Sequence, residues 1–572
     1  MARSRHKGLR YFGVLVLAVW SGNAAPPENA AAFSPPGPPA AESSALPILR
    51  ALPDSAAFGL AFPPLPGLCE QLAALAARFP AGPELVARFN TLLESTFRDE
   101  GMHGFRDLAS FLTSKGLAPD SPSGVFVDLT LTVADAEEAG RKFAQAVQDQ
   151  VLAPAMSYHP PAVLALFGVS DPEMAEASVR ETLLRIGGNS TDVFEEPRPT
   201  TGKASGLHWL REGLAYSVNN QWLYITNSEA LFNAVVARQA QPAEMRHGAA
   251  EDSASTPGDT VLLTRLDKVT SRALDLLSVV HYTGQVYPTL QWPVASAEGR
   301  RQFLDFYAPE TGPDPVVTTI SITPERVELV SRVELGKHPG LARADIAPAR
   351  PGLSRHIPSG GLLSCFVNWG DSLNAAAVGC SELLPVELRE QYWREIRRAL
   401  DTFARGQTAF GVRPGTPPAV TLFLEVSDGV GAAGLMGQYL DEIRGEELGG
   451  DTWHLGVGSL DLFVQLEGGV LVATNRKEQL PAMRESVRSQ GGQAFFETLD
   501  PPVRGGDIIS VLSLDTACPA DLATLLAAFG FVSDAASQAA VAEWLGPIRE
   551  IRSGKTIEYP WQTQFLTLYL SP

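Results

Sequence analysis

The chain has 572 residues, of which 45% are hydrophobic and 19% are charged, and its formal net charge is −19 at pH 7. This length is too great for a single hydrophobic core, so two to four domains are expected. The hydrophobic content excludes intrinsic disorder. The negative charge is spread along the chain and repels phosphate backbones and anionic lipid head groups, so nucleic acid is not expected as a partner.

The N-terminus has the pattern of a secretory signal peptide. Four Lys or Arg side chains lie in the first ten residues, and the uncharged run YFGVLVLAVW follows at 11–20. Small residues come next, with cleavage expected after Ala24 or Ala25. The run is half of the ~20 apolar residues that span a bilayer, which disfavours a retained anchor. We therefore predict a signal peptide over 1–25 and a mature protein that is periplasmic or extracellular, without a transmembrane segment.

The next segment, 26–45, is rich in Pro and Ala and shows no periodicity. This composition is typical of a stiff, poorly ordered linker.

Beyond the linker, similar segments occur twice. Thr226-Asn227 and Thr474-Asn475 both follow an apolar run, and the offset between them is 248 residues. The same offset places Gly258-Asp259 on Gly506-Asp507. Upstream, 51–62 resembles 356–369 at an offset of 305, and 124–147 resembles 419–443 at an offset of 293. The falling offsets predict two tandem repeats, 46–345 and 350–572, with an insertion at about 150–205 in the first.

Within each repeat, two strands are expected around a tight turn, Asn219-Asn220 in one and Gly468-Gly469 in the other, because Asn and Gly tolerate positive φ. Several segments carry apolar residues on one helical face only, for example Leu72, Leu75 and Phe79. Such helices pack on a sheet. We therefore predict the α+β class, each repeat being a largely antiparallel sheet with helices packed on one face.

The Thr-Asn pairs have capping-box spacing. Thr226 precedes Glu229 by three residues, and Asn475 precedes Glu478 by three. We predict that Thr226, Asn227, Thr474 and Asn475 are helix caps, each stabilising by about 1 kcal/mol.

Four cysteines are present: Cys69, Cys365, Cys380 and Cys518. An oxidising compartment would permit disulfides, and Cys365 and Cys380 are near enough for a local loop. Buried free thiols are the other alternative.

No catalytic, metal or cofactor motif is complete. HExxH and CxxC do not occur in the sequence, and the Gly-Lys pairs at 202–203 and 554–555 lack the earlier Gly of a phosphate loop. The acidic segment 97–107 holds Asp99, Glu100, His103 and Asp107, for which a polar surface is the simpler interpretation. We therefore predict no catalytic residues, no metal ligands and no cofactor.

Two Trp-His pairs are the candidate ligand-binding residues. His208-Trp209 and Trp453-His454 lie in predicted strands of the two repeats. An exposed Trp beside a His could stack on a sugar or a peptide, whereas a Trp in a strand often belongs to the core.

The start of each repeat, Leu52-Pro53 or Ile357-Pro358 followed by a strand, resembles a family of exported bacterial proteins, as do the hairpin, the Thr-Asn pair and the helix after it. The family is known only as a domain of unknown function. The resemblance implies a secreted, internally duplicated protein and provides no catalytic residues.

The missing motifs favour an exported, non-catalytic binding or structural protein of the cell envelope, which binds an unknown envelope partner, a polymer or a lipid. The alternative is a secreted hydrolase with an unrecognised acidic active site. A hydrolase would gather carboxylates and a His in one pocket, whereas a binding protein would show an apolar or aromatic surface patch.

Overall fold

The computed structural model describes residues 51–97, 108–129, 161–186, 206–209, 213–240, 259–265, 316–334, 353–356, 361–368, 407–413, 419–426, 431–434, 445–449, 452–457, 460–489, 508–514, 543–558 and 561–571, and the isolated residues Ile48, Lys142, Gln145, Asp149, Gly415, Gly429, Ala539 and Ala540. The chain divides into two compact units, Met1–Pro324 (unit 1) and Glu325–Pro572 (unit 2). The predicted signal peptide and linker lie outside the described residues. None of the helices in the described ranges has the length and hydropathy needed to cross a bilayer.

The predicted α+β architecture, in which each of two tandem repeats has its own sheet with helices on one face, is wrong. The described strands form one antiparallel sheet of 19 strands. Strands hold 46% and helices 31% of the described structure, so the sheet dominates. The main error concerns the last strand of each predicted repeat: Arg326–Glu334 (β9) and Trp561–Leu570 (β19) pair with each other over nine residues. Such strands would otherwise leave a row of backbone N–H and C=O groups unpaired at a sheet edge, and mutual pairing satisfies them.

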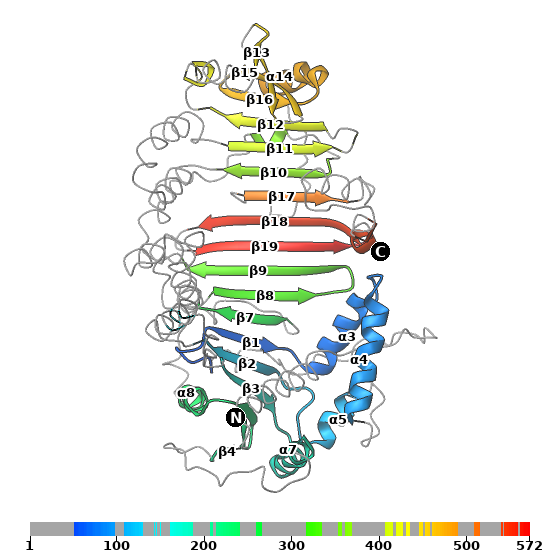
Figure 1. The fold of residues 1–572 in the computed structure, drawn as a ribbon, viewed down its shortest axis with the longest axis vertical. Coiled ribbons are helices and arrows are strands. Elements are labelled where there is room, and N and C mark those ends of the chain that lie inside the picture. The colour runs from blue at the N-terminus through cyan, green and yellow to red at the C-terminus, as the bar shows by residue number, and fades with distance from the viewer. Residues whose placement is uncertain are drawn as a thin grey trace. The chain divides into compact units, whose positions relative to one another are not determined.

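In unit 1, each strand is antiparallel to its neighbours in the order β8–β7–β1–β2–β3–β6–β5–β4 (Figure 1). The strands are Phe58–Phe62 (β1), Ser123–Asp128 (β2), Ala162–Gly168 (β3), His208–Trp209 (β4), Ala215–Val218 (β5), Trp222–Thr226 (β6), Thr260–Thr264 (β7) and Val316–Ile322 (β8). The helices are Leu65–Ala76 (α3), Gly82–Phe97 (α4), Leu108–Ser114 (α5), Pro172–Ile186 (α7) and Glu229–Gln239 (α8).

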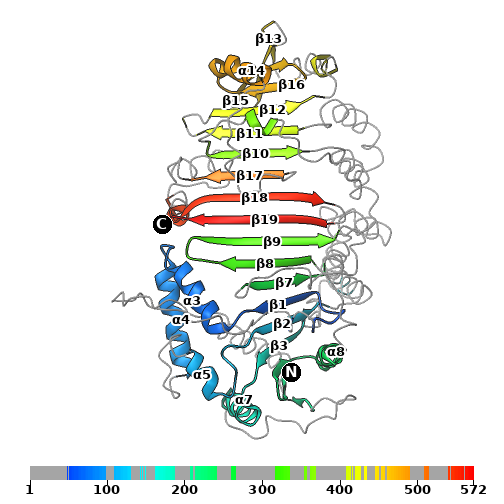
Figure 2. The ribbon, with the colours of Figure 1, turned by 180° about the vertical axis from the view of Figure 1, so that it is seen from behind.

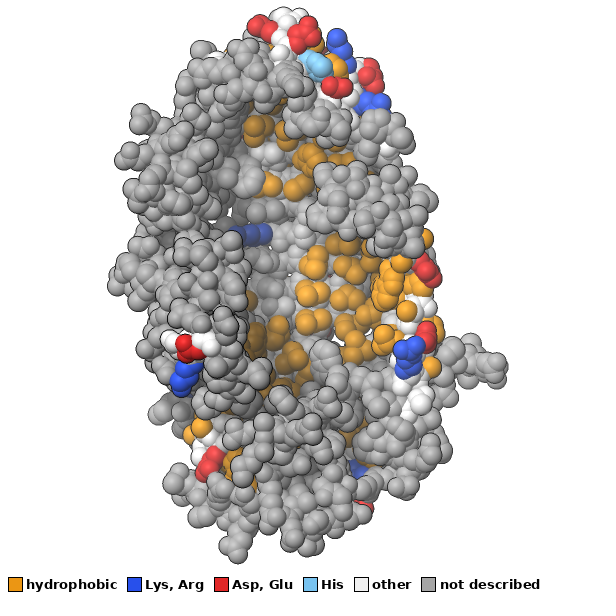
Figure 3. Space-filling view, in the orientation of Figure 1, with side chains coloured by type: hydrophobic (Ala, Val, Ile, Leu, Met, Phe, Trp, Pro, Cys, Tyr) orange, Lys and Arg blue, Asp and Glu red, His pale blue; other side chains and the backbone are white. Residues whose placement is uncertain are grey.

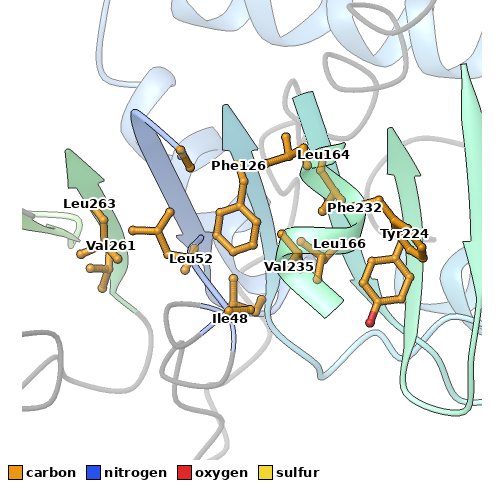
Figure 4. Packing of buried hydrophobic residues seen from close by; sticks show 14 of the residues in the cluster. Ile48, Leu52, Phe126, Leu164, Leu166, Tyr224, Phe232, Val235, Val261 and Leu263 are labelled. Atoms are coloured by element: carbon orange, nitrogen blue, oxygen red, sulfur yellow. The ribbon is translucent and has the colours of Figure 1, made fainter. Parts of the chain in front are cut away.

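Helices cover both faces of the unit 1 strands, not one face as predicted. On one face, Phe232 and Val235 of α8 pack with Leu164, Leu166 and other side chains of a core cluster (Figure 4). On the other face, α3 and α5 contribute buried residues to a second cluster, and Val179 of α7 packs against it. In Figures 1 and 2, which view the sheet broadside, α8 and the α3–α5 group are seen toward opposite ends of these strands. Strand β3 is buried on both faces, which explains its unbroken apolar sequence AVLALFG.

In unit 2, the antiparallel order is β9–β19–β18–β17–β10–β11–β12–β16–β15–β14–β13. The further elements are Leu353–His356 (η7), Leu363–Asn368 (β10), Gln407–Arg413 (β11), Ala419–Glu425 (β12), Glu446–Glu447 (β13), Thr452–Val457 (β14), Leu460–Glu467 (β15), Val470–Thr474 (β16), Lys477–Gln479 (η8), Leu480–Arg488 (α14), Ile508–Ser513 (β17) and Ile548–Glu558 (β18). The predicted hairpins are confirmed in both units, since β5 pairs with β6 and β15 with β16. In unit 1 the turn is shifted by one residue from Asn219-Asn220, because the Asn219 N–H donates to the Trp222 carbonyl and leaves Asn220 and Gln221 at the centre. Gly468 and Gly469 have positive φ values of 57° and 81°, which the two-residue turn requires.

The two units share one strand order: β7–β1–β2–β3–β6–β5–β4 in unit 1 has the same neighbours as β17–β10–β11–β12–β16–β15–β14 in unit 2. This order corrects one predicted match. Strand β2 corresponds to β11, and strand β3 corresponds to β12. Both β3 and α7 fall in the insertion predicted at about 150–205. The sequence does not mark β3 as a strand, because an apolar run without alternation resembles a buried helix as much as a strand.

The Thr-Asn pairs tie neighbouring strands together. The Asn227 side-chain oxygen accepts a hydrogen bond from the backbone N–H of Val163 at 2.7 Å, and the Asn475 oxygen accepts one from Val420 at 2.8 Å. Thr226 is fully buried and its hydroxyl donates to the Val163 carbonyl at 2.8 Å. Each tie binds the start of the adjacent strand, β3 or β12, at the point where the chain leaves the sheet.

The helix caps lie elsewhere than we predicted. Ser228, not Thr226 or Asn227, is the N-cap of α8, and its hydroxyl oxygen accepts from the Leu231 N–H at 3.2 Å. After Thr474 and Asn475 the chain enters η8, whose N-cap residue is Arg476 and makes no side-chain cap hydrogen bond. Asn227, Asn475 and Thr226 bind the adjacent strand instead. The Thr474 hydroxyl oxygen accepts a hydrogen bond from the Arg476 N–H at 3.1 Å.

The tie and the cap can be separated by mutation. Asn227→Ala removes the acceptor of the Val163 N–H, so we expect a loss of about 1–3 kcal/mol in the free energy of unfolding. Ser228→Ala removes one cap and should cost about 1 kcal/mol. Equilibrium unfolding in urea measures both values, with Asn475→Ala as the matched variant in unit 2. A larger loss for Ser228→Ala than for Asn227→Ala would contradict the assignment.

Candidate binding surface

The long strands of unit 2 separate charged from apolar side chains. In β9 the even-numbered positions are Arg326, Glu328, Val330, Arg332 and Glu334, whereas the odd-numbered positions are Val327, Leu329, Ser331 and Val333. Successive side chains of a strand point to opposite faces of the sheet. The registers with β19 and β18 place Phe565, Glu550 and Arg552 on the face of the even-numbered residues of β9. The same face also carries the main core cluster of unit 2, which contains Phe565 and packs against Val330.

One face, here called the charged face, carries ion pairs. Arg552 binds Glu550 through two hydrogen bonds, at 2.8 and 3.2 Å, and its guanidinium lies 4.6 Å from the centre of the Tyr569 ring. Arg326 lies 3.2 Å from Glu328. Further along this face, the Phe565 ring lies over Gly554, where a Cβ would approach within 2.1 Å of a ring carbon. The packing of this face is thus internally satisfied.

The opposite face, here called the apolar face, carries aliphatic side chains in register. Val327, Leu568, Ile551, Leu512 and Leu363 are successive cross-strand partners on β9, β19, β18, β17 and β10. We call these five residues the apolar row. In the next row Leu329 is paired with Leu566, and Ser553 with Ser510. The two serine hydroxyl oxygens are 2.6 Å apart.

The apolar face is accessible. All five residues of the apolar row and Leu329 are half-buried, and Leu566 is 37% exposed. Figure 3 shows hydrophobic side chains gathered over the right-hand ends of β9, β18 and β19 on the side viewed there. Apolar surface grouped in this way is typical of sites that bind a partner or a ligand.

Along the strands the apolar face becomes mixed, with polar residues beside Val333 of β9 and Val367 of β10. Ser331, Gln564 and Lys555 form a cross-strand row four residues from the apolar row, measured along β18 from Ile551 to Lys555. Gln564 is exposed, and Ser331 and Lys555 are half-buried. Among the described side chains that β9, β17, β18 and β19 place on this face, Lys555 is the charged one.

The two predicted ligand-binding residues of unit 1, His208 and Trp209, lie in different surroundings. The His208 ring stacks on Tyr216, with centroids 4.9 Å apart, and its Nε2 lies 3.7 Å from Glu176. Burial, followed by the nearby Glu176 carboxylate, raises the pKa of Tyr216. Trp209 points to the other face and packs against the main core cluster of unit 1.

In unit 2 the order of the two residues is reversed, with Trp453 before His454. Trp453 is 4% exposed and belongs to a core cluster, so its indole offers little surface for stacking. The His454 ring stacks on Phe463 at 4.9 Å, and its Nε2 lies 3.2 Å from Asp461. His208 and Trp453 thus occupy corresponding places in the shared strand order, and ligand binding by these four residues stays a prediction.

The Glu467 carboxylate is held in place by two arginines. Glu467 accepts hydrogen bonds from Arg488 at 2.8 and 3.0 Å and from Arg484 at 2.9 Å. The hydrogen bond from Arg488 is the main cause that lowers the pKa of Glu467, so this carboxyl is ionised at neutral pH and unsuited to donate a proton. In the part of the chain that the structure describes, no three His, Cys, Asp or Glu side chains are placed to hold a metal ion.

Two cysteines are free thiols. Cys69 is 2% exposed in the second core cluster of unit 1, and burial, with a smaller effect of Glu70, raises its pKa to about 12. Cys365 is half-buried on the apolar face, opposite Ser510, and burial raises its pKa as well. The local loop considered for Cys365 is therefore not closed by a disulfide, and Cys380 and Cys518 lie outside the described residues.

Comparisons with known proteins identify no relative. The chain matches no protein-family model, no curated protein and no solved structure. The proposals for this chain therefore rest on its own residues.

The burial of Cys69 predicts an inert thiol. At pH 8 the native protein should leave Cys69 unmodified by N-ethylmaleimide, since the thiolate is the reactive form and its pKa is about 12. In urea the same residue should react completely. Peptide mass spectrometry after timed alkylation measures both. Modification of Cys69 at equal rates in the two states would contradict the buried position.

Proposed function

We propose that the chain is an exported, non-catalytic protein that binds an apolar partner on the apolar face of unit 2. The observation that carries this proposal is the register of the strands, which gathers half-buried aliphatic residues of five strands in one row. The ion pairs of the same strands lie on the other face.

The energetics support a binding role. Full burial of a Val, Leu or Ile side chain contributes roughly 1.5–3 kcal/mol relative to full exposure, so several half-buried residues leave part of this free energy available to a partner. Translational and ordering costs of association reduce the net gain. A row of several aliphatic residues is therefore needed, and a single exposed Leu would not suffice.

The alternative, a hydrolase with an acidic site, has less support. Its acid would need a raised pKa, whereas Glu467, which is bound by Arg484 and Arg488, has a lowered one. The described residues of the proposed binding surface carry aliphatic, amide and hydroxyl groups, the Cys365 thiol and one lysine, a set without a carboxylate or a histidine.

Export is proposed from the sequence of the first 25 residues. Expression of the full chain in a bacterium with a periplasm should yield a mature protein that begins after Ala24 or Ala25. N-terminal sequencing of the protein recovered from the periplasm or the medium measures the site. An intact N-terminus on cytoplasmic protein would contradict export.

We also propose that the chain arose by internal duplication. The shared order of seven strands in the two units supports this, together with the recurring Thr-Asn ties. Antiparallel sheets permit many strand orders, so a common one favours a common origin. A sequence alignment of homologues that matched only one unit throughout would favour late fusion of different domains instead.

Binding on the apolar face can be tested with a neutral dye. Nile red should show increased fluorescence with the wild-type protein, and Leu566→Gln with Leu568→Gln should weaken its affinity about tenfold or more, since each change removes roughly 1–2 kcal/mol of apolar contact. Leu85→Gln is the matched control, because Leu85 is 63% exposed in unit 1. The proposal would be contradicted if all variants bound the dye equally while unfolding at the same temperature as the wild-type protein.

A further inference from the structure

We infer that the apolar face of unit 2 binds an amphipathic α-helix of a partner protein. This inference rests on the proposed function and assigns a partner class to the same surface. The observation that selects a helix is the corresponding face of unit 1, on which helices of the chain itself are packed.

The two units present corresponding strands on this face. Strands β1, β7 and β8 of unit 1 have the same neighbours as β10, β17 and β18 of unit 2. In unit 1, α3 begins just after β1 and also contacts β8. Its buried residues Leu65, Leu68 and Cys69 belong to the same core cluster as Phe62 of β1, and Leu60 packs against this cluster. A helix is therefore what covers these strands where the chain supplies the cover.

Unit 2 keeps apolar surface accessible where unit 1 buries it. Cys365 and Val367 of β10 correspond to Leu60 and Phe62 of β1. Phe62 is 4% exposed in the cluster that contains α3 residues, whereas Val367 and Cys365 are half-buried. On the same face of unit 2, Leu566 is 37% exposed. A helix from a partner would bury these side chains as α3 buries those of unit 1.

The dimensions of the apolar row suit a helix of the length of α3. The row crosses five strands, so its four strand spacings of ~4.8 Å span about 19 Å. Helix α3 has 12 residues, which corresponds to a length of about 18 Å at ~1.5 Å per residue. The next row lies about 7 Å further along the strands. Two rows with their side chains therefore match the ~10 Å width of one helix.

Backbone hydrogen bonding favours a helix over an extended peptide. The backbone groups of β18 and β19 are already paired with neighbouring strands. An extended peptide laid on this face would leave its own N–H and C=O groups without partners, which is costly at an apolar surface. A helix satisfies these groups internally and brings only side chains to the contact. The hydroxyls of Ser510 and Ser553 satisfy each other and need no polar group from the helix.

The size of the face disfavours a second copy of the chain as the occupant. From Leu568 in the apolar row to Gln564 the strand advances four residues. With about 13 Å in this direction and about 19 Å across the strands, the described face covers roughly 250 Å². A stable dimer buries about 800 Å² on each partner. A single helix suits the smaller area.

The test uses the mature full-length protein and a synthetic peptide that stands in for the partner's helix. The peptide has the sequence of residues 64–79, which contains α3, with Cys69→Ala and a fluorescent label. Since α3 of the intact chain covers unit 1, the peptide should bind unit 2, with saturable fluorescence anisotropy. Leu566→Gln with Leu568→Gln in the protein should weaken binding about tenfold or more, and the control Leu85→Gln should leave it within about twofold.

A second peptide and a cross-link identify the contact. Leu68→Gln with Leu72→Gln in the peptide should weaken binding about tenfold or more, because both leucines pack in the second core cluster of unit 1. Thermal unfolding establishes that each protein variant is folded. Replacing Leu566 by the photoreactive p-benzoylphenylalanine should give a cross-link to the peptide on irradiation, and mass spectrometry locates the bond.

The outcomes separate the two proposals. If Nile red binds on the apolar face but the peptide neither binds nor displaces it, the helical partner is overturned while binding on that face stands. Equal affinity of the two peptides also overturns the helical partner. A cross-link from position 566 to a second copy, or to a distant part of the same chain, in place of the peptide does so as well. If neither dye nor peptide depends on Leu566 and Leu568, both proposals fail.

Discussion

The pairing of β19 with both β9 and β18 determines how side chains are distributed in unit 2. Nine residues of β19 pair with β9, and ten residues pair with β18 on the other side. Because side chains alternate along a strand, a shift of one residue would move every aliphatic side chain of the row to the charged face. The surface proposed for binding is therefore a property of this register, and no single residue creates it.

The register is held from the charged face. Arg552 is fixed between Glu550 and the Tyr569 ring, and Phe565 packs onto Gly554. These contacts join β18 to β19 in one alignment, since a shifted strand would place a Cβ under the Phe565 ring. The charged face thus fixes this alignment, together with the core cluster that contains Phe565 and Ile509.

Local features of the fold were predictable from the sequence, and the large ones were not. Turns depend on neighbouring residues, so Gly468-Gly469 and Asn219 marked the hairpins correctly. The pairing of β9 with β19 joins residues more than 200 positions apart. Neither strand has a sequence pattern from which its partner strand could be predicted. The capping assignment failed for a related reason: the Asn227 and Asn475 side chains are captured by Val163 and Val420, which are distant in sequence.

The apolar face had a sequence signal that could have been read. The alternation of Val327, Leu329, Ser331 and Val333 with charged residues predicts a strand with one apolar face. What alternation cannot show is whether that face is covered. In unit 1, the residues that correspond to Cys365, Ser510 and Ser553 are Leu60, Leu262 and Thr318. Leu60 packs against the second core cluster of unit 1, to which the helices α3 and α5 contribute.

The same strand order therefore serves different surfaces in the two units. A strand order specifies which backbones pair, and it leaves the side chains free to differ. Unit 1 uses this face to pack α3, α5 and α7 onto its strands. In unit 2 the corresponding positions on β17 and β18 carry the paired hydroxyls of Ser510 and Ser553, between the Leu329–Leu566 pair and Cys365. Two hydroxyl groups that satisfy each other can stand beside an apolar ligand without the cost of an unpaired polar group. Function in this chain is for that reason to be sought in the residues by which unit 2 departs from unit 1.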